Sequence, residues 1–171
     1  MRAKEFALHA HGSTAHYYDK YLPYEFHLRM VVKVAEDFSL LIPAGWHEVV
    51  TAACWLHDTI EDCRCSYRDV LNASRYEVAE IVRAVTNDQR GRNRKERMPM
   101  QCYTDIRETT CAVFVKLCDR IANVQYSKMT GSKMFEMYKN EQEYFQAMLN
   151  VEPSLQPMWD YLNNLFLCQP Q

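Results

Sequence analysis

The sequence lacks any long, uncharged apolar run. The N-terminal segment Met1–Gly12 alternates charged residues and histidines with short apolar pieces, so it does not have the continuous apolar stretch of a signal peptide. No later segment stays uncharged over the roughly 20 residues that a helix needs to cross a bilayer. We therefore predict a cytoplasmic protein that makes no contact with a membrane.

An excess of charge of one sign is also missing. The 20 lysines and arginines nearly balance the 22 aspartates and glutamates, which leaves a formal net charge of −2. A balance of this kind gives no whole-protein attraction to nucleic acid, so anion recognition must come from a local cluster. No repeat or low-complexity segment divides the 171 residues. We predict one domain over 1–171 and no nucleic-acid partner, and a homo-oligomer stays open.

The 7 cysteines include no Cys-x-x-Cys pair. Cys63 and Cys65 are too close along the chain for an ordinary disulfide or a zinc knuckle. In a cytoplasmic protein, an odd set of this kind indicates reduced, structural thiols. The set comprises Cys54, Cys63, Cys65, Cys102, Cys111, Cys118 and Cys168.

Glycine is scarce, with 4 residues in the chain, and the apolar residues recur at helical rather than alternating spacing. This pattern predicts an all-α fold, a single-domain helical bundle with no sheet. One helix should begin with Pro23 in its first turn and carry His27. Its apolar stripe repeats every four residues, at Phe26, Met30, Val34 and Phe38.

Helix starts and a buried helix can also be identified. Residues 48–56 are almost all apolar or small, which is typical of a helix buried on all sides. The patterns Ser66-x-x-Asp69 and Ser74-x-x-Glu77 are typical of capping boxes that open two further helices.

The second half of the chain continues with helical patterns. One long helix should cover 106–121, and amphipathic helices should follow over 135–148 and 155–166. Between them and the first half, residues 87–101 contain helix breakers around a basic segment, 90–97. Such a segment is usually solvated charge, but beside a phosphate site Arg90 and its neighbours could hold a polyphosphate.

Charged and imidazole side chains interrupt the buried-helix patterns. His57 and Asp58 end the apolar run, and Asp119 breaks another, between Val113 and Ile121. Burying such groups is costly unless they are paired or bind a metal. Together with His27 they form a nitrogen and oxygen donor set, which suits Mn²⁺, Fe²⁺, Zn²⁺ or Ni²⁺ rather than a structural zinc.

The order of these residues resembles the H…HD…D pattern of the HD superfamily of metal-dependent phosphohydrolases. More narrowly, the chain is similar to the RelA/SpoT-type hydrolase domain in four ordered segments. These are LPYEFHL, WLHDTIEDC, YEVAEIVRAVT and VKLCDRIANV, all within residues 5–130. Departures include Leu28, where the family usually has proline, and a segment before His27 that offers only His16 and Lys20 as basic residues.

The resemblance implies a role for each motif residue. The metal ligands would be His27, His57, Asp58 and Asp119, with Mn²⁺ as the usual ion. Glu61 and Asp62 would act on the attacking water and the substrate phosphate. A neighbouring carboxylate can orient water and accept its proton, and a divalent ion activates water and phosphoryl oxygen.

Further residues are candidates for substrate binding. The resemblance places Asn123 near the nucleotide ribose, and the family often has a histidine at the position of His11. Lys116 either faces phosphate or pairs with Asp119, and Arg90 represents the basic segment.

The leading hypothesis is hydrolysis of ppGpp or pppGpp to GDP or GTP plus pyrophosphate. Another nucleotide, such as NADPH, a deoxynucleotide or a different signalling nucleotide, is the alternative substrate. A third hypothesis is a nucleotide-binding module without catalysis, against which the intact Glu61-Asp62 pair argues.

Overall fold

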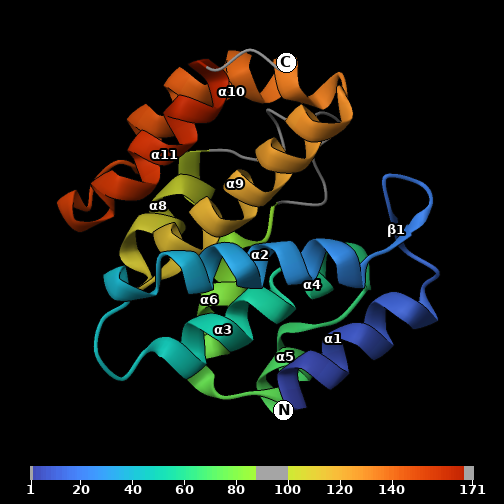
Figure 1. Cartoon of the computed structure of the whole chain (residues 1–171). Helices are drawn as coiled ribbons and strands as arrows, with labels where there is room; N and C mark the ends of the chain where they lie inside the picture. The colour runs from blue at the N-terminus through green and yellow to red at the C-terminus, as the bar shows by residue number, and fades with distance from the viewer. Residues whose placement is uncertain (1, 88–99, 168–171) are drawn as a thin grey trace.

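The computed structural model describes residues 2–87 and 100–167, and this part of the chain is almost entirely helical (Figure 1). This confirms the predicted all-α fold. The basic segment 90–97, with Arg90, and Cys168 lie outside the described residues. The α-helices are α1 (Arg2–Ser13), α2 (Glu25–Asp37), α3 (His47–Leu56), α4 (Thr59–Asp62), α5 (Tyr67–Ala73), α6 (Tyr76–Val85), α8 (Met100–Glu108), α9 (Ala112–Thr130), α10 (Met134–Leu149) and α11 (Gln156–Leu167). Short 3-10 helices cover Ser39–Leu41 and Pro153–Leu155.

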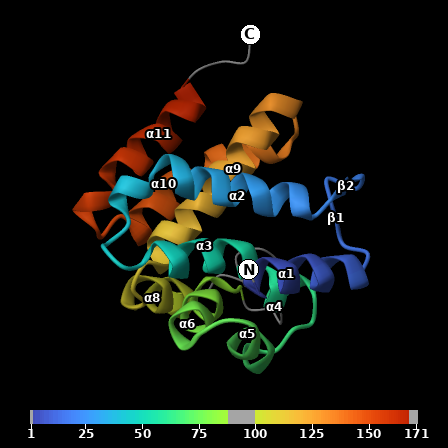
Figure 2. The ribbon, with the colours of Figure 1, turned by 60° about the horizontal axis from the view of Figure 1, so that its bottom comes forward.

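Helix α9 forms the centre of the bundle. It packs against α2, α3 and α6 on one side and against α10 and α11 on the other, so most of its surface is buried (Figures 1 and 2). Because a helix covered on several sides gains from apolar side chains all round, the run from Ala112 to Leu117 is apolar except for Lys116. Any charged residue on α9 must therefore find a partner in the interior.

Helix α2 has a different start and a different buried face from those predicted. Pro23 lies in a short strand, and the helix begins at Glu25. The predicted stripe was partly wrong because Phe26 is exposed, whereas His27 and Leu28 are buried. Since α2 packs against both α3 and α9, its buried face is turned toward His27.

A small hairpin corrects the prediction that the chain has no sheet. Strands β1 (Tyr17–Tyr18) and β2 (Leu22–Pro23) pair antiparallel between α1 and α2. Asp19 and Lys20 make the turn with left-handed backbone angles, φ 46° and 70°. Two residues per strand are too few for an alternating pattern, so the hairpin leaves no signal in the sequence.

One capping box is confirmed and the other is wrong. Ser66 and Asp69 make reciprocal hydrogen bonds at the start of α5. Helix α6 is instead preceded by Arg75, whose side chain makes no capping hydrogen bond. The Ser74 hydroxyl donates to the Val70 carbonyl at 2.6 Å, so it helps to end α5.

The single long helix predicted over 106–121 is also wrong. Helix α8 ends at Glu108, and α9 begins at Ala112 after Cys111, whose φ of 62° is left-handed. The apolar spacing keeps its period across this break, so periodicity could not reveal it. None of the described helices is both long and apolar enough to cross a bilayer.

Candidate metal centre

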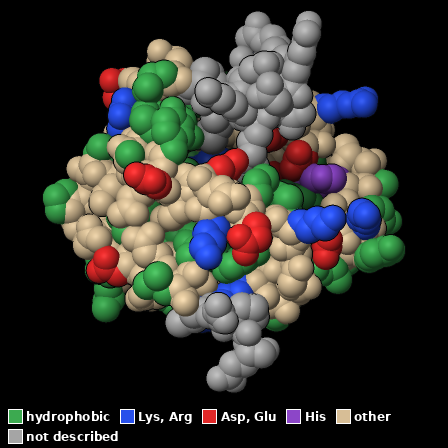
Figure 3. Space-filling view, turned by 90° about the horizontal axis from the view of Figure 1, so that it is seen from above, with side chains coloured by type: hydrophobic (Ala, Val, Ile, Leu, Met, Phe, Trp, Pro, Cys, Tyr) green, Lys and Arg blue, Asp and Glu red, His purple; other side chains and the backbone are tan. Residues whose placement is uncertain are grey.

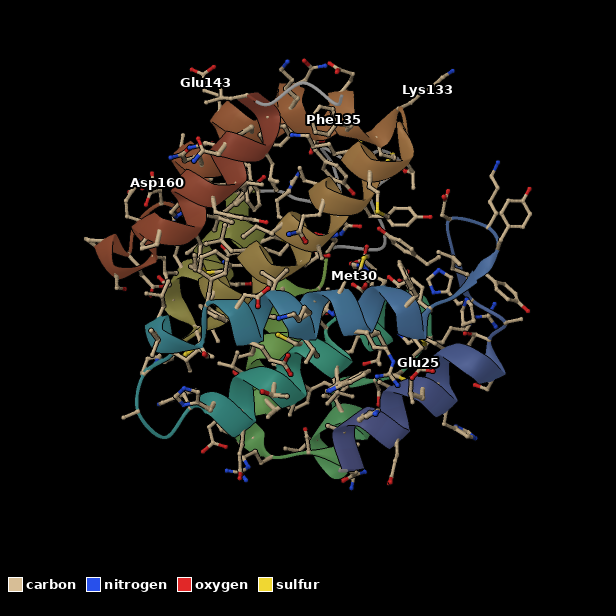
Figure 4. All side chains as sticks on the ribbon, in the orientation of Figure 1. Glu25, Met30, Lys133, Phe135, Glu143 and Asp160 are labelled. Atoms are coloured by element: carbon tan, nitrogen blue, oxygen red, sulfur yellow. The ribbon has the colours of Figure 1, made fainter. Side chains whose placement is uncertain are left out.

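Three helices bring the predicted metal ligands to one point. His27 lies in the first turn of α2, His57 immediately follows α3, and Asp119 lies within α9. Figure 4 labels Glu25 and Met30, which precede and follow His27 on α2. Both histidines are buried, with exposed fractions of 1% and 2%.

The donor atoms of this group lie within metal-ligand reach of one another. His27 Nε2 is 3.3 Å from His57 Nε2 and 3.3 Å from Asp119 Oδ1, and His57 Nε2 is 3.7 Å from the same oxygen. Asp58 Oδ2 lies 2.9 Å from His57 Nε2 and 3.5 Å from His27 Nε2. The group of His27, His57 and Asp119 could hold a divalent ion, with Asp58 beside it.

Hydrogen bonding leaves His57 ready to act as a ligand. Its Nδ1 lies 3.0 Å from the Cys54 carbonyl oxygen, which can only accept, so Nδ1 must be the donor. The neutral ring therefore has its free lone pair on Nε2, which faces His27 and the carboxylates. A histidine that donates its other nitrogen in this way is the usual arrangement in metal sites. The residues present thus fit a divalent ion.

The electrostatics of the cluster also favour a cation. Burial opposes the charged form of both imidazoles, but Asp58 and Asp119 outweigh it and raise the pKa of His27 and His57. Burial similarly opposes ionisation of Asp119, yet the two histidines hold its pKa well below the usual range. The site therefore attracts positive charge, either as protons on the imidazoles or as a metal ion.

Metal affinity should consequently rise with pH. Below its raised pKa each imidazole carries a proton that an incoming ion must displace, so a divalent ion should bind more weakly at about pH 6 than at about pH 8. Calorimetric titration in buffers of different ionisation enthalpy would measure both the affinity and the protons released. Equal affinity at the two pH values, without proton release, would contradict this account.

Tyr24 is a neighbour of the cluster that the sequence analysis did not single out. Its hydroxyl donates a short hydrogen bond to Asp58 Oδ2, and its ring stacks on His11 with ring centroids 4.1 Å apart. His11 is buried behind this ring, and its Nδ1 lies 3.3 Å from His16 Nδ1. A cavity adjoins the cluster, and His11 is not among the residues that line it. It is placed to support Tyr24 rather than to contact a ligand directly.

The two carboxylates that follow the cluster have different environments. Glu61 accepts hydrogen bonds from the Asn87 main-chain N–H at 3.2 Å and from its side-chain amide at 3.1 Å. Asp62 lies 3.7 Å from His16 Nδ1. Burial, followed by the charges of Asp58 and Glu61, raises the pKa of Asp62 to about 7. Asp62 can therefore exchange a proton near neutral pH.

Asn123 and Lys116 both bind Asp119. The Asn123 amide donates to Asp119 Oδ1 at 2.6 Å. Lys116 Nζ lies 3.8 Å from Asp119 Oδ2 and donates to the Val85 carbonyl at 3.2 Å. Both residues also line the cavity. The two alternatives for Lys116 are thus compatible, because an ammonium group has three donors.

A cavity of about 800 Å³ adjoins the cluster. It is lined by His27, Asp58 and Asp119, and also by Glu61 and Asp62. The volume lies within the range of small-molecule sites. The face of the molecule drawn in Figure 3 has acidic side chains gathered beside a histidine.

Helices α8 and α10 form another wall of this cavity. Tyr103 and Tyr144 pack edge to face with their ring centroids 5.8 Å apart, and Tyr144 is 55% exposed. Arg120 also lines the cavity, where its guanidinium lies 4.2 Å from the Phe145 ring centroid and 3.2 Å from a Glu141 oxygen. Arg120 belongs to the VKLCDRIANV segment, but Tyr103 and Tyr144 come from segments without a motif, so only the packing of α8 and α10 against α9 identifies them.

No family model matches the sequence, and no curated protein matches it. Among solved structures, the chain is similar to that of a metazoan ortholog of SpoT, described as hydrolysing ppGpp and playing a role in starvation responses. The TM-score is 0.69 at 20% sequence identity, and the match covers 95% of this chain and 94% of the other. The chain therefore has the fold of a SpoT-type hydrolase, as its motifs predicted.

Proposed function

We propose that this chain is a metal-dependent phosphohydrolase that removes the 3′-pyrophosphate from ppGpp or pppGpp and leaves GDP or GTP. The observation that carries the proposal is the cluster of His27, His57 and Asp119, with both imidazoles buried, beside a cavity of about 800 Å³ that Glu61 and Asp62 also line. The similarity to the ppGpp-hydrolysing SpoT ortholog supports the choice of substrate. In this step the water oxygen bonds to the phosphorus attached to the ribose 3′-oxygen, and the bond between that phosphorus and the 3′-oxygen breaks. Pyrophosphate leaves with the water oxygen, and the ribose 3′-oxygen takes up a proton to become a hydroxyl group.

The proposed ligands of the ion are His27, His57, Asp58 and Asp119, and Mn²⁺ is the proposed metal. When bound, a divalent ion lowers the pKa of water and withdraws charge from a phosphoryl oxygen. Tyr24 would hold Asp58 in place, because its hydroxyl donates to the carboxylate. The Cys54 carbonyl would do the same for His57 through Nδ1.

The two carboxylates that follow the cluster, Asp62 and Glu61, would have different roles toward the attacking water. Asp62, whose pKa is raised to about 7, would accept the proton of the attacking water. Asn87 holds the carboxylate of Glu61 with two hydrogen bonds, so Glu61 is suited to orient that water. An acceptor with a pKa near the working pH is the most effective kind.

The rest of the cavity would bind the nucleotide. Lys116 has a donor left to offer to phosphate after its contacts with Val85 and Asp119. The Asn123 carbonyl oxygen accepts one hydrogen bond, from Tyr18, and retains a lone pair for a ribose hydroxyl. The exposed ring of Tyr144 offers an apolar face to a base.

A nucleotide panel tests this proposal. Purified protein loaded with Mn²⁺ should release pyrophosphate from ppGpp and pppGpp, and His57→Ala protein serves as the inactive control. NADPH and deoxynucleoside triphosphates belong in the same panel, with orthophosphate and nucleoside products measured separately. Turnover of one of these nucleotides instead of ppGpp would change the proposed substrate, but the assignment of the protein as a hydrolase would still hold. Tight nucleotide binding without turnover by the metal-loaded protein would overturn the enzymatic proposal.

A further inference from the structure

Tyr18, on the short hairpin, contacts one of the proposed metal ligands directly. Its ring stacks on the His27 imidazole with centroids 4.8 Å apart and an angle of 13° between the planes. Among the described residues, His27 Nδ1 has no hydrogen-bond partner. Apart from the contacts at Nε2, the ring of His27 is therefore oriented by packing, in contrast to that of His57, whose Nδ1 donates to the Cys54 carbonyl.

The hydroxyl of the same tyrosine reaches a second proposed ligand through one intermediate residue. Tyr18 OH donates to Asn123 Oδ1 at 2.9 Å, and Asn123 Nδ2 donates to Asp119 Oδ1 at 2.6 Å. The first bond also decides which end of the Asn123 amide faces Asp119, since only Nδ2 can donate to a carboxylate. A tyrosine hydroxyl is protonated at physiological pH, so Tyr18 is the donor of this hydrogen bond.

Other contacts hold the hairpin against α9. Tyr126, on α9, donates its hydroxyl to Asp19 Oδ2 at 2.8 Å, and its ring meets the Tyr18 ring edge to face at 4.8 Å. Asp19 and Lys20 keep left-handed backbone angles although neither is glycine. Such conformations cost free energy and persist where the surrounding contacts impose them. The hairpin is therefore held in the position that brings Tyr18 to His27 and Asn123.

From these contacts we propose that Tyr18 is a positioning residue of the metal centre, acting on His27 through its ring and on Asp119 through Asn123. The inference rests on the metal centre of the proposed function and not on the identity of the nucleotide. Partners of this outer kind orient the ligands of a metal, and their loss typically weakens metal binding by roughly 10- to 100-fold.

Calorimetric titration of metal-free protein with Mn²⁺ tests the role without a substrate. Tyr18→Phe keeps the ring on His27 and removes the hydrogen bond to Asn123, so the dissociation constant should rise about 10-fold. Tyr126→Phe is the matched control, because it removes the other hydroxyl that ties the hairpin to α9 and does not touch the cluster. This control keeps the edge-to-face ring contact with Tyr18, which should hold the hairpin in place. It should therefore bind Mn²⁺ as the wild type does, although both variants should lose similar thermal stability.

A double-mutant cycle separates the route through Asn123 from a general loosening of the hairpin. If Tyr18 acts through Asn123, Tyr18→Phe should weaken Mn²⁺ binding in the wild-type background but have no further effect in Asn123→Ala protein. Wild-type affinity in Tyr18→Phe, equal weakening in Tyr126→Phe, or additive effects in the cycle would each overturn the inference. So would a wild-type protein that does not bind Mn²⁺. If the cycle gives the expected result but the protein hydrolyses none of the nucleotides, only the proposed function is refuted.

Discussion

The His57→Ala variant should lose both its bound metal and its nucleotide turnover while it keeps its helical structure. The substitution removes the nitrogen that lies 2.9 Å from Asp58 and 3.3 Å from His27, at the centre of the donor set. It also leaves two partly buried carboxylates with one imidazole, so the remaining site is incomplete. Affinity for Mn²⁺ should fall by more than the roughly 10- to 100-fold that loss of an outer partner causes.

Metal analysis after dialysis, turnover with ppGpp, and circular dichroism together check this expectation. His47→Ala is the matched control, since His47 is the first residue of α3, the helix that His57 follows, and it is exposed and contacts the Ser39 carbonyl instead of the cluster. Helical signal should survive in both variants because the apolar core extends through α2, α3, α6 and α9 away from the ligands. Stoichiometric metal in folded His57→Ala protein would refute the ligand assignment.

The cluster could be anticipated from the sequence because its residues break strong local patterns. His57 and Asp58 end a helix that is otherwise apolar, and Asp119 lies in the most buried helix of the bundle. Burial of a charge demands a compensating partner, so such residues are conspicuous without any coordinates. What the pattern could not supply was the convergence of α2, α3 and α9, which depends on packing between distant segments.

Several contacts of the site could not be predicted from local sequence patterns, because they too join segments that are distant in the sequence. Asn87 follows the end of α6, and its two hydrogen bonds to Glu61 span 26 residues of sequence. Tyr18 lies in a hairpin too short to leave a periodic signal, although it touches His27. Tyr24 was visible as part of a motif, but its hydrogen bond to Asp58 follows only from the fold.

Helix boundaries show where local chemistry is sufficient and where it is not. The Ser66 capping box was predicted correctly because both of its hydrogen bonds lie within four residues. Ser74 has the same spacing to a glutamate, yet its hydroxyl binds backward to Val70. The break at Cys111 depends on a backbone angle that no side-chain pattern reports. Sequence spacing thus identifies candidate capping residues. Whether a candidate caps the next helix depends on whether its hydroxyl finds another acceptor, as Ser74 does in the Val70 carbonyl.

The proposed catalytic roles depend on the positions of Glu61 and Asp62 relative to the cluster. Both lie on the short helix α4 directly after Asp58 and line the cavity. Neither belongs to the group of three residues whose donor atoms converge on one point. Glu61 is held by Asn87, and Asp62 has the raised pKa of a proton acceptor. Their loss should therefore affect turnover far more than metal binding.

Glu61→Gln and Asp62→Asn should each lower kcat by about 10²-fold or more and leave Mn²⁺ content and nucleotide affinity close to wild type. Each change is nearly isosteric and removes a charge. The expected decrease in kcat is the usual result of losing general acid–base assistance or the orientation of the attacking water. Glu77→Gln, at an exposed position on α6, is the control for removing a carboxylate charge and should keep full activity. Single-turnover rates, metal analysis and nucleotide titration separate the three effects. An unchanged kcat in both variants would remove these residues from the mechanism, whereas loss of metal in either would make that residue a ligand.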